Sequence, residues 1–473
     1  MYQVSFLYSS RETGSARLRD ALAKLALSYN IKFWSDAKSV DNGFATELQE
    51  ELDASDAVIH CVGPEGLGPY QTINEIKLTA QSLEKNPTQK LVIVLLGSAQ
   101  LPTDLLALGV FHDRTTKLNL SLNGTEADEV LRAALPKAEP REDPEASGFA
   151  RDIVKKTQKT GLQRSLTIVL GPYAFAEASE SGATPAGAIR QLIRDNRLRG
   201  YAPWLDVMGS IARATETSDE DAAQAVVRAL SPGPEAHPGS LRVYLRLLAA
   251  NWARIAGNHR LFLVAGSPDL RLDTALRSVT IPVQHVRLVH CPREHGRLKG
   301  ERIRDDHGKI DRDCIQQPDE ALAPNDRVVL IKPFGCFEEP EKALLTAEHW
   351  RASSSEMMPL PSGIANQMTR SVLLVLGAGV FSPTLQILFS SLMRDALKRA
   401  DNNANRYIVH NPDAKVCDPL HRIESALFAD KQKRQMFEDW IKDNYGLWSK
   451  TLNSINFLMH LDYFLRNIDE AIA

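Results

Sequence analysis

The stretch with the clearest chemical pattern is Gly63–Ala80, whose helix-like end carries a single carboxylate, Glu75. The apolar run Asp56–Val62 before it predicts a β-strand, and the glycines and prolines that follow predict a loop. Apolar residues then recur at roughly helical spacing, at Ile73, Ile76, Leu78 and Ala80. We therefore expect Glu75 in the first turn of a helix, just past the carboxyl end of a strand, where open α/β sheets bind ligands. An acid there also complements the helix dipole, so its type alone leaves a purely structural role open.

The whole chain has the composition of an ordinary soluble protein. Its 473 residues are 43% hydrophobic and 24% charged, which allows two or three domains with substantial cores. A net charge of −3 gives no bulk signal for nucleic acid or anionic membrane. The five cysteines are widely spaced and form no CxxC or Cys/His cluster, which favours reduced thiols, a cytoplasmic location and no structural zinc. We expect no signal peptide and no membrane span.

Strands and helices alternate through the first part of the chain. Met1–Leu7 and Ile31–Trp34 predict strands, and Lys90–Leu96 predicts another that ends in a glycine. Between the first two, a helical stripe is formed by Leu18, Leu22, Leu25 and Ala26. Alternation of this kind predicts a parallel sheet with helices on both faces.

Several ordered motifs in residues 2 to about 120 resemble a bacterial Toll/interleukin receptor (TIR) domain. Gly66–Gln71, GLGPYQ, is similar to the family's GLGPWQ, with Tyr70 where tryptophan is usual. Tyr8–Glu12 is similar to the end of its opening FISYSSRD, and Trp34 with Asp36 matches its W-D loop. The resemblance implies a flavodoxin-like TIR domain over residues 1–135.

Catalytic members of this family cleave the bond between nicotinamide and ribose in NAD⁺, and their essential glutamate matches Glu75. A carboxylate suits this reaction because the ribosyl centre becomes oxocarbenium-like as the nicotinamide leaves. The resemblance implies NAD⁺ as substrate, with no metal and no further cofactor. It assigns substrate binding to Tyr8, Ser9, Ser10, Arg11, Trp34, Asp36 and Tyr70.

Two assignments in this domain stay open. The family usually has four residues from the aromatic residue to the glutamate, whereas Tyr70 to Glu75 spans five, which leaves Asn74 at the strict position. We favour a one-residue loop insertion, with an inactive domain carrying Asn74 there as the alternative. Trp34 is either a core aromatic residue or part of the ligand loop.

A second domain follows a linker that we place at residues 136–162, which is rich in proline and charge at its start. Ser165–Leu170 predicts its first strand, and Tyr407–His410 its last. The stretches Arg260–Asp269, Val328–Gly335 and Val372–Gly379 resemble successive motifs of sirtuins. The resemblance implies a Rossmann-like α/β domain over residues 163–430. An amphipathic helical segment, 431–473, is predicted to pack on it.

The residues that would carry sirtuin catalysis do not match. The glycine-rich opening begins at Gly171 but continues with proline and tyrosine, and Ser267 replaces the nicotinamide-side asparagine. Phe334 replaces the general-base histidine and cannot accept a proton. We predict that the sirtuin positions Gly171, Ser267, Asp269 and Phe334 are inactive. We predict a degenerate domain that serves as a scaffold or ligand sensor, or a core that binds no ligand.

The leading hypothesis is a TIR NAD⁺ glycohydrolase that is activated by oligomerisation through both domains. Bacterial fusions of this kind are associated with abortive-infection defence against phage by NAD⁺ depletion, with a small nucleotide or a phage-derived molecule as candidate trigger. One alternative is a cyclase that makes a cyclic ADP-ribose signal with the same residues. The other is a non-catalytic interaction module. Nucleic acid and membrane are not expected partners.

Overall fold

The chain divides into two compact units, Met1–Glu142 and Asp143–Ala473, in a computed structural model. The boundary falls inside the range 136–162 that we predicted as a linker. The structure describes residues 2–9, 13–35, 44–120, 127–158, 164–171, 240–255, 259–266, 286–290, 298–303, 310–315, 327–332, 370–377, 405–411 and 426–472, with the single positions 174, 272, 276, 367, 368 and 424.

The first unit contains a five-stranded sheet in the order β2-β1-β3-β4-β5, with every neighbouring pair parallel. Its strands are β1 (Gln3–Tyr8), β2 (Lys32–Ser35), β3 (Ala57–Val62), β4 (Lys90–Leu96) and β5 (Thr115–Leu120). Apolar residues fill β3 and β4 because both faces of these strands are covered. This confirms the predicted α/β class, and the strand order is that of flavodoxin-like folds.

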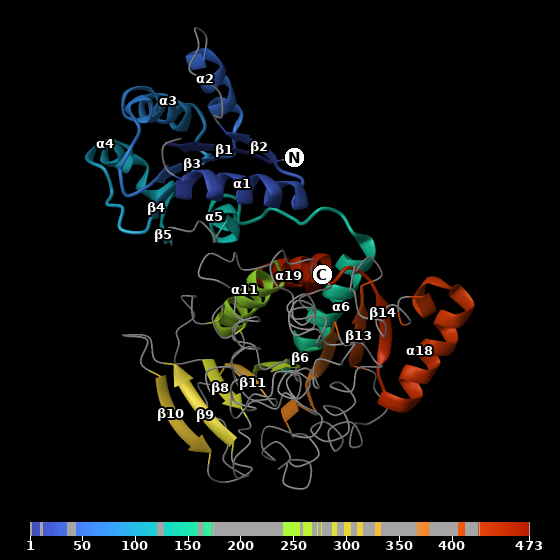
Figure 1. Ribbon diagram of the computed structural model, residues 1–473. Helices are drawn as coiled ribbons and strands as arrows, with labels where there is room; N and C mark the ends of the chain where they lie inside the picture. The colour runs from blue at the N-terminus through green and yellow to red at the C-terminus, as the bar shows by residue number, and fades with distance from the viewer. Residues whose placement is uncertain are drawn as a thin grey trace, which may run out of the picture. The chain divides into compact units, whose positions relative to one another are not determined.

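Helices cover both faces of this sheet (Figure 1). One face carries α1 (Thr13–Ser28) and α5 (Ala127–Ala134), and the other carries α2 (Phe44–Ala54) and α3 (Ile76–Lys85). The short α4 (Thr103–Leu106) and a 3₁₀ segment, Ala107–Arg114, connect β4 to β5. The core under α2 and α3 is built from side chains such as Leu7, Leu48, Val58, Ile76 and Ile93.

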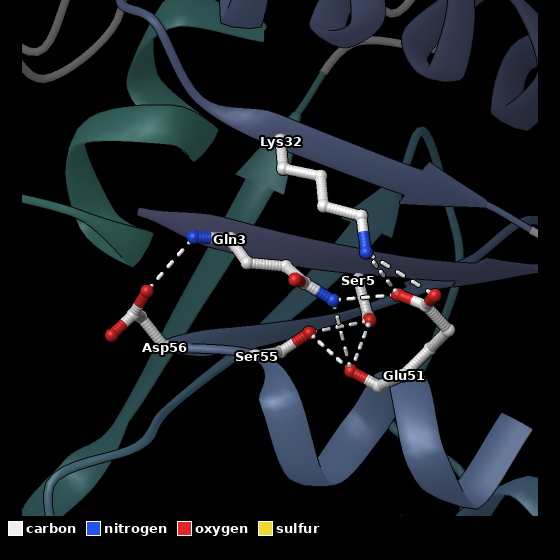
Figure 2. Close-up of polar contacts among 6 residues, drawn as sticks. All are labelled: Gln3, Ser5, Lys32, Glu51, Ser55 and Asp56. Carbon is white, nitrogen blue, oxygen red and sulfur yellow. Dashed lines mark hydrogen bonds and ion pairs between the residues drawn. The ribbon is translucent and has the colours of Figure 1, made fainter. Parts of the chain in front are cut away.

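The last turn of α2 is fixed to the sheet by hydrogen bonds around Glu51 (Figure 2). Its backbone carbonyl accepts from Ser55 Oγ at 2.7 Å and from Ser5 Oγ at 3.4 Å. Its carboxylate accepts from Gln3 Nε2 at 2.6 Å and from Lys32 Nζ at 3.1 Å. A carbonyl in the last helical turn lacks a partner within its own helix, so these bonds both satisfy it and anchor α2 to β1 and β2.

The second unit contains a nine-stranded sheet in the order β10-β9-β8-β11-β7-β6-β12-β13-β14. Neighbours are parallel, except that β9 is antiparallel to β8 and to β10. The strands are β6 (Leu166–Leu170), β7 (Leu261–Ala265), β8 (Val286–His290), β9 (Leu298–Ile303), β10 (Ile310–Ile315), β11 (Val328–Lys332), β12 (Val372–Leu376), β13 (Arg406–His410) and β14 (Trp448–Thr451). Every residue of β6, β7, β11 and β12 is buried, as expected for the centre of a sheet covered on both faces.

Three helices pack together in this unit: α6 (Pro144–Gln158), α11 (Ser240–Ile255) and α19 (Ser454–Arg466), with α19 in contact with both others (Figure 1). Asn251 Nδ2 on α11 donates to Asp462 Oδ1 on α19 at 2.7 Å, and Arg466 is 3.2 Å from the other oxygen of that carboxylate. The C-terminal segment also contains α18 (Lys431–Tyr445) and the short α20 (Ile468–Ile472). Together with β14, which pairs with β13, these elements make residues 431–472 part of the second unit.

Candidate active site

The candidate site lies at the carboxyl ends of β1 and β3. The chain passes from β1 to β2 on one side and continues to β3 on the other, so the strand order reverses between β1 and β3. In open α/β sheets such a reversal opens a crevice that ligands use. Ser9 follows β1 and lies beside Gly68, which follows β3: a Cβ on Gly68 would be 3.4 Å from Ser9 Oγ. Ser9 and the loop after β3 therefore meet at this edge.

The loop after β3 is a turn that depends on glycine. Gly66 donates its backbone N–H to the Gly63 carbonyl at 2.9 Å. Its φ of +84° is a backbone conformation that residues other than glycine rarely adopt. The helix begins at Pro69, and the buried Gln71 caps its first turn by accepting from the Gly68 N–H at 2.9 Å. Glu75 thus lies in the second turn of this helix, one turn later than we predicted.

A π-helical turn, Gln71–Glu75, precedes α3. The Ile76 N–H donates to the Gln71 carbonyl, five residues earlier, where an α-helix would use a carbonyl four residues earlier. This turn therefore holds one residue more than a regular α-helical turn between the same two groups. Glu75 is 2% exposed and Asn74 is half-buried, so the two side chains occupy different environments.

Polar side chains lie on either side of Glu75 along the buried face of the helix. Gln71, Glu75 and Thr79 recur every four residues, and all three are buried. Thr79 Oγ1 is 3.0 Å from Nε2 of His60, a fully buried residue of β3. Burial lowers the pKa of His60 to about 4, so the imidazole is neutral at pH 7. The spacing of 71, 75 and 79 within an apolar pattern could have identified Gln71 and Thr79 from the sequence.

Two aromatic residues assigned to substrate binding pack against the core beneath α2 and α3. Tyr70 and Phe44 have ring centroids 5.3 Å apart, and Phe44 begins α2. Trp34, near the end of β2, is half-buried against the same apolar cluster, which includes Ile76. This position supports the core interpretation of Trp34, although the residue is only partly buried.

Tyr8 lies on the opposite face of the sheet from α3. Its ring is 5.5 Å from Phe6, the neighbour on the same side of β1, and its hydroxyl accepts from Arg19 of α1. The Arg19 guanidinium carbon also lies 5.4 Å from the centre of the Tyr8 ring. The structure therefore brings Ser9, but not the side chain of Tyr8, toward the loop that leads to Glu75.

In the second unit, the glycines that follow β6 and β7 make backbone contacts with a neighbouring strand. Gly171 donates its N–H to Leu376 of β12 at 2.8 Å, and Gly266 donates to Leu170 of β6 at 2.6 Å. A Cβ on Gly266 would lie 2.4 Å from that same oxygen. The Gly171 and Gly266 amides are therefore used in backbone hydrogen bonds to neighbouring strands.

Six of the predicted site residues lie outside the described residues: Ser10, Arg11, Asp36, Ser267, Asp269 and Phe334. Within the described residues, no group of three or more His, Cys, Asp or Glu side chains is arranged to hold a metal ion. In the same part of the chain, no helix is both long and apolar enough to span a membrane. Scans of this sequence against protein-family models and against curated proteins find no match.

Proposed function

We propose that the first unit is a TIR-type NAD⁺ glycohydrolase and that Glu75 is its catalytic carboxylate. The observation that carries the proposal is the position of Glu75. It is a buried acid on the helix that follows β3, next to the point where the strand order reverses. The π-helical turn supports Glu75 over Asn74, because it accommodates the residue by which this chain departs from the family spacing.

The proposed reaction consumes water and needs no other co-reactant. The bond between the ribose C1′ and the nicotinamide nitrogen breaks, and nicotinamide leaves with the bonding electron pair. Water attacks C1′ and loses a proton, which gives ADP-ribose. The carboxylate of Glu75 would stabilise the positive charge that develops on the ribosyl centre and would orient the ribose hydroxyls.

Two polar neighbours of Glu75 are neutral, which is compatible with this role. His60 and Thr79 come from the strand and the helix turn next to Glu75, and neither carries charge at pH 7. A carboxylate is more effective on a developing cation where water is excluded. The near-complete burial of Glu75 also fits an enzyme that is restrained until assembly opens and completes the site. In this proposal the second unit controls that assembly, and the biological role is antiphage defence in the cytoplasm.

The test is product analysis after purified protein is incubated with NAD⁺. We expect nicotinamide and ADP-ribose, and a loss of at least about 100-fold in rate for Glu75→Gln. Asn74→Ala is the matched control and should keep most of the rate. Loss of activity in Asn74→Ala with near-normal turnover in Glu75→Gln would reverse the assignment of the two positions. A cyclic product in place of ADP-ribose would identify the cyclase alternative.

The burial of Glu75 also favours a second candidate, a non-catalytic interaction module in which Glu75 only orders the helix. This module would release no nicotinamide at any protein concentration. Glu75→Gln would then change the stability of the first unit and nothing else.

A further inference from the structure

Exposed apolar side chains gather on α18 of the second unit. Met436 is 68% exposed and Trp440, one turn later, is 37% exposed. Among the described residues, six large hydrophobic side chains are exposed, and three of them lie on α18 and the neighbouring β14. The third, Trp448 of β14, has Lys442 Nζ 4.3 Å from the centre of its ring. Met436 and Trp440 are therefore the apolar centre of this surface.

Charged residues flank this centre on the same helical face. Lys433, Met436, Trp440 and Asp443 are separated by three, four and three residues, which places them in one stripe along α18. All four are exposed, whereas Phe437 and Ile441 of the same helix are buried against the unit. The stripe has lysine at its start, two large apolar residues in its middle and aspartate at its end.

This stripe is complementary to itself in the antiparallel direction. Positions 433 and 443, and positions 436 and 440, are each symmetric about position 438, the middle of the helix. If two copies of α18 pack antiparallel about a two-fold axis there, Lys433 faces the partner subunit's Asp443. Met436 then faces the partner subunit's Trp440. A two-fold interface requires this kind of self-complementary pattern.

We propose that the α18 stripe, Lys433, Met436, Trp440 and Asp443, is a dimerisation surface and that its partner is a second copy of this chain. Two helices that meet over a few large side chains bury less than about 1,200 Å², the size of weak and transient interfaces. The dimer therefore forms only where the local concentration of the chain is high. The dimerisation proposal is independent of the proposed NAD⁺ cleavage, because it is tested by measuring the molecular mass of the assembly.

Charge reversal tests the geometry without melting the helix. Lys433→Glu puts an acid in the first turn of α18, and Asp443→Lys puts a base in its last turn, so both changes suit the helix dipole. Lys433 is also 3.6 Å from Asp430, but both side chains are exposed and this pair contributes little. Each single variant sets like charges opposite each other twice in the dimer, and we expect about tenfold weaker association.

The experiment is sedimentation velocity of the full chain over a range of about 1–100 µM, the affinity range of transient complexes. An equimolar mixture of Lys433→Glu and Asp443→Lys should recover a dimer, because both interchain pairs are then oppositely charged. Lys431→Glu is the control, since it makes the same charge change off the stripe. A wild-type chain that stays monomeric overturns the proposal. So does a mixture that associates no better than either variant, or a control that weakens association equally.

Discussion

The Ile76 N–H and the Gln71 carbonyl form a hydrogen bond that spans five residues, and this bond sets the position of Glu75. With one residue fewer, the same two groups would form an ordinary α-helical bond. Gln71 and Ile76 could then keep their places, as the cap of the Gly68 loop and as part of the core respectively. The additional residue is therefore one of the four that lie between them.

This relationship predicts opposite outcomes for two adjacent deletions. Removing Asn74 should convert the π turn to an α turn, leave Glu75 directly before Ile76, and keep both the fold and the proposed activity. Removing Glu75 should give the same continuous helix with Asn74 in that position, so the protein folds without nicotinamide release. Circular dichroism and the nicotinamide assay check both proteins. A Glu75-deleted protein that still turns over NAD⁺ would contradict the assignment.

The low pKa of His60 predicts that the first unit becomes less stable in mild acid. Its pKa is about 4 in the folded chain and 6.5 ordinarily, so between these values the unfolded chain binds a proton that the folded chain does not. Its contribution to the free energy of unfolding should fall, as pH drops from 6.5 to about 4, by up to about 1.4 kcal/mol per pH unit. His60→Gln cannot titrate and should lack this part of the pH dependence.

The thiol of Cys61 can report this unfolding separately from the second unit, because it is buried in β3 and donates to Ser15 Oγ of α1. Its alkylation can be followed in urea at pH 7 and pH 5, with the labelled peptide identified by mass spectrometry. Equal pH dependence in the wild type and in His60→Gln would remove His60 as the cause.

Glycine substitutions in the second unit should have opposite signs at two positions. Gly377, after β12, has a φ of +58°, and a Cβ there would lie 2.1 Å from Ala174 Cα. Gly377→Ala should cost about 3 kcal/mol or more, because neither backbone segment can move away cheaply. Gly148→Ala, in α6 with nothing within 4 Å of the added Cβ, should stabilise the chain by about 0.5–1 kcal/mol. Melting temperatures of the two variants, compared with wild type, measure both effects.

The buried strands could be predicted from sequence because an apolar run needs no distant information. Lys90–Leu96 was predicted with the bounds that β4 has, and Asp56–Val62 differs from β3 by one residue. β14 gave no such signal, since its four residues, WSKT, alternate between exposed and half-buried and pair with β13 some 40 residues earlier. The strand conformation of β14 comes from this nonlocal pairing, which cannot be predicted from the four residues of the strand alone.

The candidate site was less accessible to sequence reasoning for a similar reason. The position of Glu75 after a strand follows from the local sequence pattern. The π turn depends on which carbonyl accepts the Ile76 N–H, and residue types do not determine that hydrogen bond. The face that Tyr8 occupies follows from alternation along β1, whereas its contact with Arg19 depends on how α1 packs.

The hydrogen bonds around Glu51 fix the C-terminal end of α2 to the sheet (Figure 2). The other end begins at Phe44, which is held near the candidate site by its contact with the Tyr70 ring. Phe44 lies seven residues from Glu51, about 10 Å along the helix axis, so a rotation of about 15° at Glu51 moves Phe44 by about 3 Å. Any movement of α2 that uncovers the helix bearing Glu75 therefore pivots at the far edge of the sheet. Amide exchange faster in residues 45–48 than in 52–55 would be its signature, and uniform protection along α2 would rule the pivot out.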